Sequence, residues 1–90
     1  MAIDSDPRPE LVRLEPPSGP VDGGQQVTVH GNHLQYVIDL YFDHDAAIIK
    51  EQTPTTLVAI TPGQSEGPVW VHAESSGGYS NGLRYRYTSG

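Results

Sequence analysis

Residues 16–31, PPSGPVDGGQQVTVHG, decide the fold of this 90-residue chain. Prolines and glycines make a turn-rich entry, and Gly23 and Gly24 let the backbone reverse just before the residues begin to alternate. In the alternating part, Val27 and Val29 share one face of a strand, and polar residues occupy the other face. A strand with one apolar face, entered through a sharp reversal, favours a half-buried antiparallel sheet.

The same pattern recurs along the chain, which contains 10 glycines and 8 prolines. A loop is expected over residues 18–24 and a turn over residues 75–81. Short strands at roughly ten-residue spacing predict an all-β fold, an immunoglobulin-like antiparallel β-sandwich of about seven strands. The expected strands are residues 10–15, 25–31, 36–43, 46–51, 55–61, 67–74 and 82–88.

Length and composition limit the classes of protein to which the chain can belong. Ninety residues predict one domain over residues 10–88, preceded by a flexible arm over residues 1–9, which are polar and contain two prolines. The net charge is −6, with 11 acidic and 5 basic residues, so we expect neither nucleic acid nor an anionic membrane as a partner. The absence of cysteine excludes disulfides and thiolate metal sites.

The first residues lack the basic and apolar pattern of a signal peptide. The location therefore stays open between a virion or cytoplasmic assembly and an extracellular protein from which this domain is excised.

A series of short motifs follows the expected strands in order. They are residues 14–20 (LEPPSGP), 23–24 (GG), 27–32 (VTVHGN), 41–43 (YFD), 61–63 (TPG), 67–71 (GPVWV) and 83–87 (LRYRY). In this order the motifs resemble the IPT/TIG domain, which is found in plexins, some transcription factors and many bacterial and phage surface proteins. The resemblance covers residues 10–88 and implies an immunoglobulin-like fold, but it does not imply one activity.

The chain departs from this family at one turn. Family members often have Phe-Gly-Gly where this chain has Phe42-Asp43-His44-Asp45, so the turn is more acidic than usual. The transcription-factor members contact DNA through basic loops, whereas the matching loops here are neutral or acidic. The resemblance therefore does not imply DNA binding for this chain.

The sequence predicts neither a metal site nor a catalytic triad. Asp43, His44 and Asp45, with Asp39 upstream, offer metal-ligand atoms, but calcium needs six or more oxygens and these residues also form solvated turns. The serines lie in no nucleophile-elbow setting, and no His/Asp/Ser pattern supports a triad. We expect no metal, no cofactor and no catalytic residues.

The exposed face of one sheet is the candidate for function. In an immunoglobulin-like arrangement, the strands expected at residues 36–43, 67–74 and 82–88 are neighbours. Their core faces are then Ile38/Leu40/Phe42, Val69/Val71/Ala73 and Leu83/Tyr85/Tyr87, and the opposite face carries Val37, Asp39, Tyr41, Trp70, His72, Arg84 and Arg86.

Tryptophan, tyrosine and arginine are the residue types enriched in binding hot spots. The predicted partner-binding surface is therefore Tyr41, Trp70, His72, Arg84 and Arg86. In the alternative interpretation, the Trp70 ring stacks on an arginine stem and only stabilises the sheet.

We interpret the chain as a non-catalytic structural or interaction module. The first hypothesis is an accessory component, for decoration or assembly, of a virion or another large assembly, with a protein or assembly surface as partner. A second hypothesis is a carbohydrate-binding or spacer domain excised from a secreted enzyme or adhesin, because a Trp/Tyr pair on a flat sheet also stacks on sugar rings. A cytoplasmic regulatory partner is a third.

Overall fold

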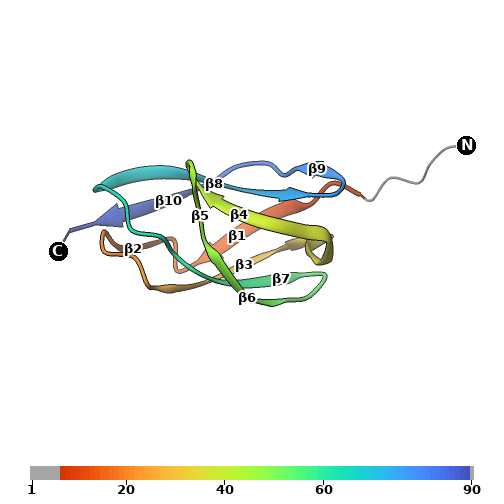
Figure 1. Cartoon of the computed structure of the whole chain (residues 1–90), viewed down its shortest axis with the longest axis horizontal. Helices are drawn as coiled ribbons and strands as arrows, with labels where there is room; N and C mark the ends of the chain where they lie inside the picture. Colours follow the sequence, from red (N-terminus) through yellow and green to blue (C-terminus); the bar gives the residue numbers. More distant parts are fainter. Residues whose placement is uncertain (1–6, 90) are drawn as a thin grey trace, which may run out of the picture.

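The computed structural model describes residues 7–89, which form two packed β-sheets (Figure 1). One sheet has the order β1-β3-β7-β6, with β1 (Glu10–Glu15), β3 (Gln26–Asn32), β7 (Thr56–Ile60) and β6 (Ile48–Gln52). The other has the order β2-β10-β8-β4-β5, with β2 (Ser18–Pro20), β10 (Leu83–Thr88), β8 (Gly67–Ser75), β4 (Val37–Phe42) and β5 (Asp45–Ala46). A short strand β9 (Gly78–Tyr79) pairs with β8.

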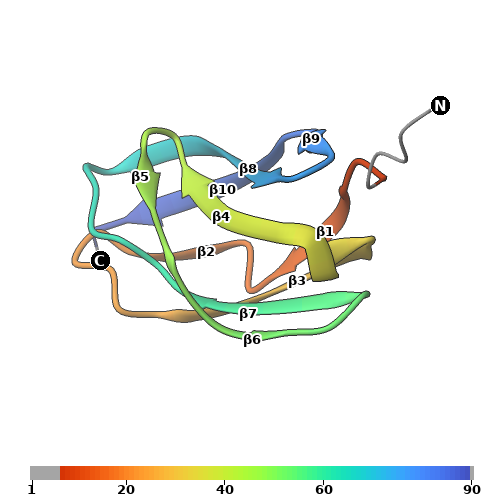
Figure 2. The same cartoon turned by 45° about the vertical axis from the view of Figure 1, so that its right-hand side comes forward.

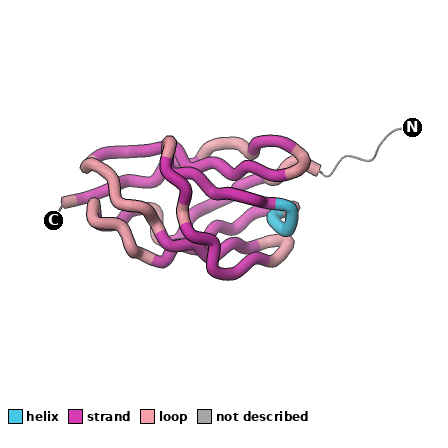
Figure 3. Tube along the Cα trace, in the orientation of Figure 1, coloured by secondary structure: helices cyan, strands magenta, loops and turns pink. Residues whose placement is uncertain are grey.

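The predicted all-β immunoglobulin-like sandwich is confirmed. Figure 2 shows the two layers from a second angle, and Figure 3 shows that strands and loops make up almost all of the described chain. The one helical element within residues 7–89 is a 3-10 turn, η1 (Leu34–Tyr36). Most of the flexible arm predicted over residues 1–9 lies outside the described residues.

Two expected elements are different in the structure. Residues 46–51 were predicted as one strand, but the chain crosses there from one sheet to the other, so that β5 and β6 belong to different sheets (Figure 1). The expected loop over residues 18–24 contains β2, which pairs in parallel with the C-terminal strand β10. Local alternation predicts neither feature, because both depend on pairing with a distant strand.

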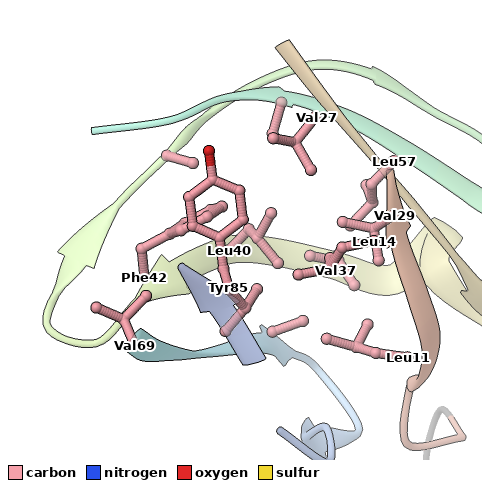
Figure 4. Packing of buried hydrophobic residues seen from close by; sticks show 14 of the residues in the cluster. Leu11, Leu14, Val27, Val29, Val37, Leu40, Phe42, Leu57, Val69 and Tyr85 are labelled. Carbon is pink, nitrogen blue, oxygen red and sulfur yellow. The ribbon is translucent and has the colours of Figure 1, made fainter. Parts of the chain in front are cut away.

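The core lies between the two sheets, and its largest side chains are aromatic rings that pack against one another. Val27 and Val29 are fully buried, as their alternation predicts (Figure 4). The Tyr85 ring lies edge-on to Phe42, with ring centroids 5.0 Å apart, and 5.1 Å from Tyr87. The Tyr87 hydroxyl donates to the Pro62 carbonyl at 2.6 Å, and burial raises the pKa of Tyr87. These large rings therefore fill the core while the Tyr87 hydroxyl keeps a polar partner.

One predicted core residue faces solvent instead. Ile38 is 60% exposed, whereas Val37, predicted on the outer face, is only 6% exposed. The pairing of β4 with β8 shifts register between Val37 and Asp39, so an extra residue interrupts the two-residue period. Beyond the shift the alternation resumes, and Leu40 and Phe42 are fully buried as predicted.

The Gly-Gly reversal brings two of the quoted sequence motifs together. Gly23 and Gly24 have φ values of 76° and 78°, in the left-handed region that glycine favours. A Cβ atom at position 23 would lie 2.6 Å from the backbone of Pro62 and of Gly63. Only glycine fits this close approach, and the Gly24 N–H donates to the Thr61 carbonyl at 2.9 Å.

Candidate functional site

The outward side of the β10-β8-β4 region presents a continuous group of rings and charges. On β8, Val69, Val71 and Ala73 are buried, so the intervening side chains point away from the core. Neighbouring strands extend this surface by cross-strand pairing. We call the set the outer aromatic face, which comprises Asp39, Tyr41, Trp70, His72, Glu74, Tyr79, Arg84 and Arg86.

Trp70 is held in place but not covered. The Arg84 guanidinium carbon lies 4.2 Å from the Trp70 ring centroid, and the two residues are direct cross-strand partners. Trp70 is nevertheless 51% exposed. The predicted outward orientation of Trp70 is therefore confirmed, and it coexists with the arginine stacking of the alternative interpretation.

Three more rings continue the surface along β8. Tyr41 and His72 are cross-strand partners whose stacked rings have centroids 5.3 Å apart and planes 26° apart. On the other side of His72, the Tyr79 ring centroid lies at 5.8 Å. The Tyr41 hydroxyl donates to Glu74 Oε1 at 3.3 Å. The rings thus form a row on a sheet surface rather than a pocket.

Tyr79 was missed at the level of sequence, where it lies in an expected turn. It is 57% exposed and pairs with Glu74 in the short β8–β9 hairpin. The Ser76-Gly77 dipeptide is the signal that could have revealed it, because Ser-Gly marks a turn, and here the residues on either side of it, Ser75 and Gly78, pair.

Charges of opposite sign occupy different parts of the outer aromatic face. Asp39 and Glu74 are cross-strand partners, and Arg84 and Arg86 project from β10. Desolvation, followed by the Asp39 and Glu74 carboxylates, raises the pKa of Tyr41 above its ordinary value. The face therefore has an acidic and a basic part.

Asp43 links the acidic turn to the Trp70 backbone. Its N–H donates to the Trp70 carbonyl at 2.8 Å, and its Oδ1 accepts a hydrogen bond from the Trp70 N–H at 3.0 Å. Asp43 has a φ of 58°, a value that asparagine and aspartate tolerate better than most residues, and that glycine adopts freely. The departure from Phe-Gly-Gly thus replaces a glycine with a residue that also supplies a hydrogen-bond acceptor.

The sequence model of the IPT/TIG domain matches residues 9–87, almost all of the residues that form the sandwich. The chain belongs to the IPT/TIG domain family. Members of this family are non-catalytic immunoglobulin-like modules of larger proteins, and they mediate interactions. No curated protein sequence matches the chain.

Solved structures place the same fold inside much longer chains. The full extracellular region of plexin A4 has a TM-score of 0.81 at 21% identity, over 89% of this chain and 7% of that one. Gamma-CGTase from alkalophilic Bacillus clarkii has a TM-score of 0.81 at 22% identity, over 100% of this chain and 14% of that one. Bacteroides ovatus SGBP-B, in complex with a mixed-linkage heptasaccharide, has a TM-score of 0.65 at 11% identity, over 96% of this chain and 22% of that one. At these identities the likeness is one of fold.

In this IPT/TIG domain the histidines are dispersed. His72 lies on the outer aromatic face, whereas His30 Nε2 lies 2.9 Å from Glu15 Oε1 on the other sheet. His33 lies just before η1, and His44 lies in the β4–β5 turn. Within residues 7–89, no three His, Cys, Asp or Glu side chains gather to hold a metal ion. None of the helical residues described forms a segment long and apolar enough to cross a bilayer.

Proposed function

We propose that this IPT/TIG domain is a binding module that joins a larger assembly through the outer aromatic face, as an accessory component of a virion or another large assembly. The surface that carries the interaction is Tyr41, Trp70, His72, Arg84 and Arg86, now extended by Tyr79. The observation that carries the proposal is the half-exposed indole of Trp70 beneath an arginine.

The physical basis is burial of rings that are already ordered. Trp70 is fixed between its neighbours before any partner arrives, since Arg84 lies over the ring and Gly82 lies against it. Covering such a ring removes apolar surface from water at little further cost in side-chain entropy. Arg84 and Arg86 then orient the partner, because their guanidinium edges offer several donors in a fixed geometry.

The test uses the one tryptophan of the chain as its own reporter. We expect a red-shifted emission that iodide quenches readily, and a blue shift with protection when assembly particles are added. Trp70→Ala should abolish co-sedimentation with those particles. The matched control is Ile48→Ala, which removes an apolar side chain that is even more exposed, at 64%, from the other sheet. If Trp70→Ala sediments with the particles as the wild type does, the proposed surface is wrong.

A second candidate function is carbohydrate binding on the same face. It is favoured by the row formed by Tyr41, His72 and Tyr79, since aromatic rings offer apolar faces on which sugar rings stack. The similar fold of SGBP-B, whose structure contains a mixed-linkage heptasaccharide, motivates the choice of probe. Retention on insoluble mixed-linkage glucan that Tyr79→Ala abolishes would support this function. If the chain binds neither particles nor glucan, the spacer hypothesis is left.

A further inference from the structure

The charged corners of the outer aromatic face are arranged diagonally about His72. Along β8, the Arg84–Trp70 pair lies two residues before His72, and the Asp39–Glu74 pair lies two residues after it. Strand β10 flanks β8 on one side and β4 flanks it on the other. Arg84 and Asp39 are therefore the opposite corners of a diagonal centred on His72, at equal displacement from it, and Arg86 lies two residues beyond Arg84 on β10.

These corners are too far apart to neutralise each other within one copy. Two strand spacings and four residues along β8 separate the Cα atoms of Arg84 and Asp39 by about 16 Å. This distance exceeds the screening length of about 8 Å at physiological ionic strength. Among residues 7–89, the ion pairs are Arg13–Glu15 and His30–Glu15, both on the other sheet. Arg84, Arg86 and Asp39 thus have no ion-pair partner in the part of the chain that is described.

A two-fold rotation exchanges these two corners. The axis of this rotation passes through His72, lies in the plane of the face and is perpendicular to the Arg84–Asp39 diagonal. When a second copy is placed against the first by this rotation, each Arg84 meets the Asp39 of the other copy. Because the operation is two-fold, the contact forms twice. The same rotation brings Trp70 of each copy toward the Tyr41–His72 stack of the other copy.

We propose that the partner of the outer aromatic face is a second copy of this chain, packed face to face with reciprocal Arg84–Asp39 contacts. The proposal rests on the proposed function and names the partner of that same surface. An isologous contact requires one surface to complement itself, and this face does so. It carries two arginines and two carboxylates, so its formal charge is balanced although the whole chain carries −6.

The charge pattern also separates this partner from a neutral glycan. Stacking of sugar rings needs the aromatic row but gives no role to opposite charges at opposite corners. In a self-contact, those charges set the register and disfavour other orientations. Stable interfaces bury about 800 Å² per partner, which is a large share of the 4975 Å² surface of this small domain. We therefore expect a concentration-dependent dimer that weakens as salt is added.

The experiment is charge exchange, followed by sedimentation velocity of the full 90-residue chain over a concentration series. We expect Arg84→Glu and Asp39→Arg each to raise the dissociation constant at least about tenfold, because both contacts of each homodimer become like-charged. An equimolar mixture of the two variants should regain wild-type association, since both contacts are then Glu–Arg or Asp–Arg. Lys50→Glu, which makes the same change of charge on β6, should associate as the wild type does.

The mixture distinguishes loss of contact from loss of fold, because misfolded variants cannot restore each other. A wild-type chain that stays monomeric throughout the series, or a mixture that does not regain association, overturns the proposal. Particle or glucan binding that depends on Trp70 in a monomeric chain would leave the proposed function intact and make the partner a different molecule. If Trp70→Ala changes neither self-association nor binding to particles or glucan, the proposed function fails as well.

Discussion

Gly82 lies against the indole of Trp70, so closely that a Cβ atom at position 82 would stand 3.1 Å from Cε3 of the ring. This contact is tighter than ordinary van der Waals packing, and the ring would have to move by a few tenths of an ångström to admit a methyl group. The room left by glycine therefore sets the position in which Trp70 meets Arg84.

Gly82→Ala should displace the indole and weaken its contact with Arg84. We expect more efficient iodide quenching of the tryptophan emission and a loss of stability of about 0.5–1 kcal/mol, the usual value of an exposed cation–π contact. Arg84→Gln is the matched control, because it removes the cation but leaves the room at Gly82. Unchanged quenching in Gly82→Ala would show that the glycine does not position the ring.

The Asn81 side chain joins the two sheets at the start of β1. The Leu11 N–H donates to Asn81 Oδ1 at 2.8 Å, and Asn81 Nδ2 donates to the Leu11 carbonyl at 2.9 Å. Asn81→Ala leaves both partly buried backbone groups without this partner, so we expect a loss of about 1–3 kcal/mol in urea unfolding. Asn32→Ala removes an exposed amide that bonds only to the Glu10 side chain, and should cost far less. Equal costs for the two variants would contradict the role of Asn81.

Asp43 should be replaceable by asparagine but not by alanine. Asparagine keeps an oxygen that can accept from the Trp70 N–H and tolerates the φ of 58°. Alanine loses the acceptor and is less suited to that backbone, so we expect Asp43→Ala to lower stability by about 1–3 kcal/mol. Thermal unfolding of both variants measures the difference, and equal midpoints would contradict it.

Metal ions should not alter the stability of the acidic turn. One Asp43 oxygen already accepts the Trp70 N–H, and the His44 and Asp45 side chains are exposed. We expect the same thermal midpoint with calcium, with zinc and with a chelator. A midpoint that rises with calcium or zinc and falls on chelation would restore the metal-site interpretation of this turn.

Alternation along the strands predicted the two faces of the sandwich wherever the two-residue period is unbroken. It places Val27 in the core and Trp70 outside, and both positions are confirmed. It fails at Ile38, because a register shift in β4 is a property of the pairing with β8 and leaves no mark in the local pattern.

Parts of the candidate site likewise could not be predicted from the sequence. The outward strand faces predicted that Tyr41, Trp70 and Arg84 share one surface. The close contact with Gly82 could not be predicted, because it depends on how the β9–β10 connection returns past Trp70. The parallel pairing of β2 with β10 also required knowledge of where the chain crosses between the sheets.

Glu15 should make stability depend on pH at the acidic end. The hydrogen bond with His30, and then the charge of Arg13, lower the pKa of Glu15 below its ordinary value of 4.5. A carboxylate whose pKa is depressed by folding adds stability above its unfolded pKa, and this contribution is lost as pH falls through the folded pKa. Urea unfolding measured at a series of pH values, from neutral pH down through the pKa of Glu15 in the folded protein, should therefore show a falling free energy of unfolding. Glu15→Gln should reduce the dependence of this free energy on pH.

The contribution of Glu15 to the pH dependence of stability should be small, because Glu15 is more than half exposed and solvent screens its contacts. Added salt should reduce it further, since both partners of Glu15 act through charge or charge-assisted hydrogen bonds. Glu66→Gln is the matched control, as it removes an exposed carboxylate that has no ion-pair partner within residues 7–89. If Glu15→Gln and Glu66→Gln change the acid slope equally, the slope reflects overall charge and not the contacts of Glu15.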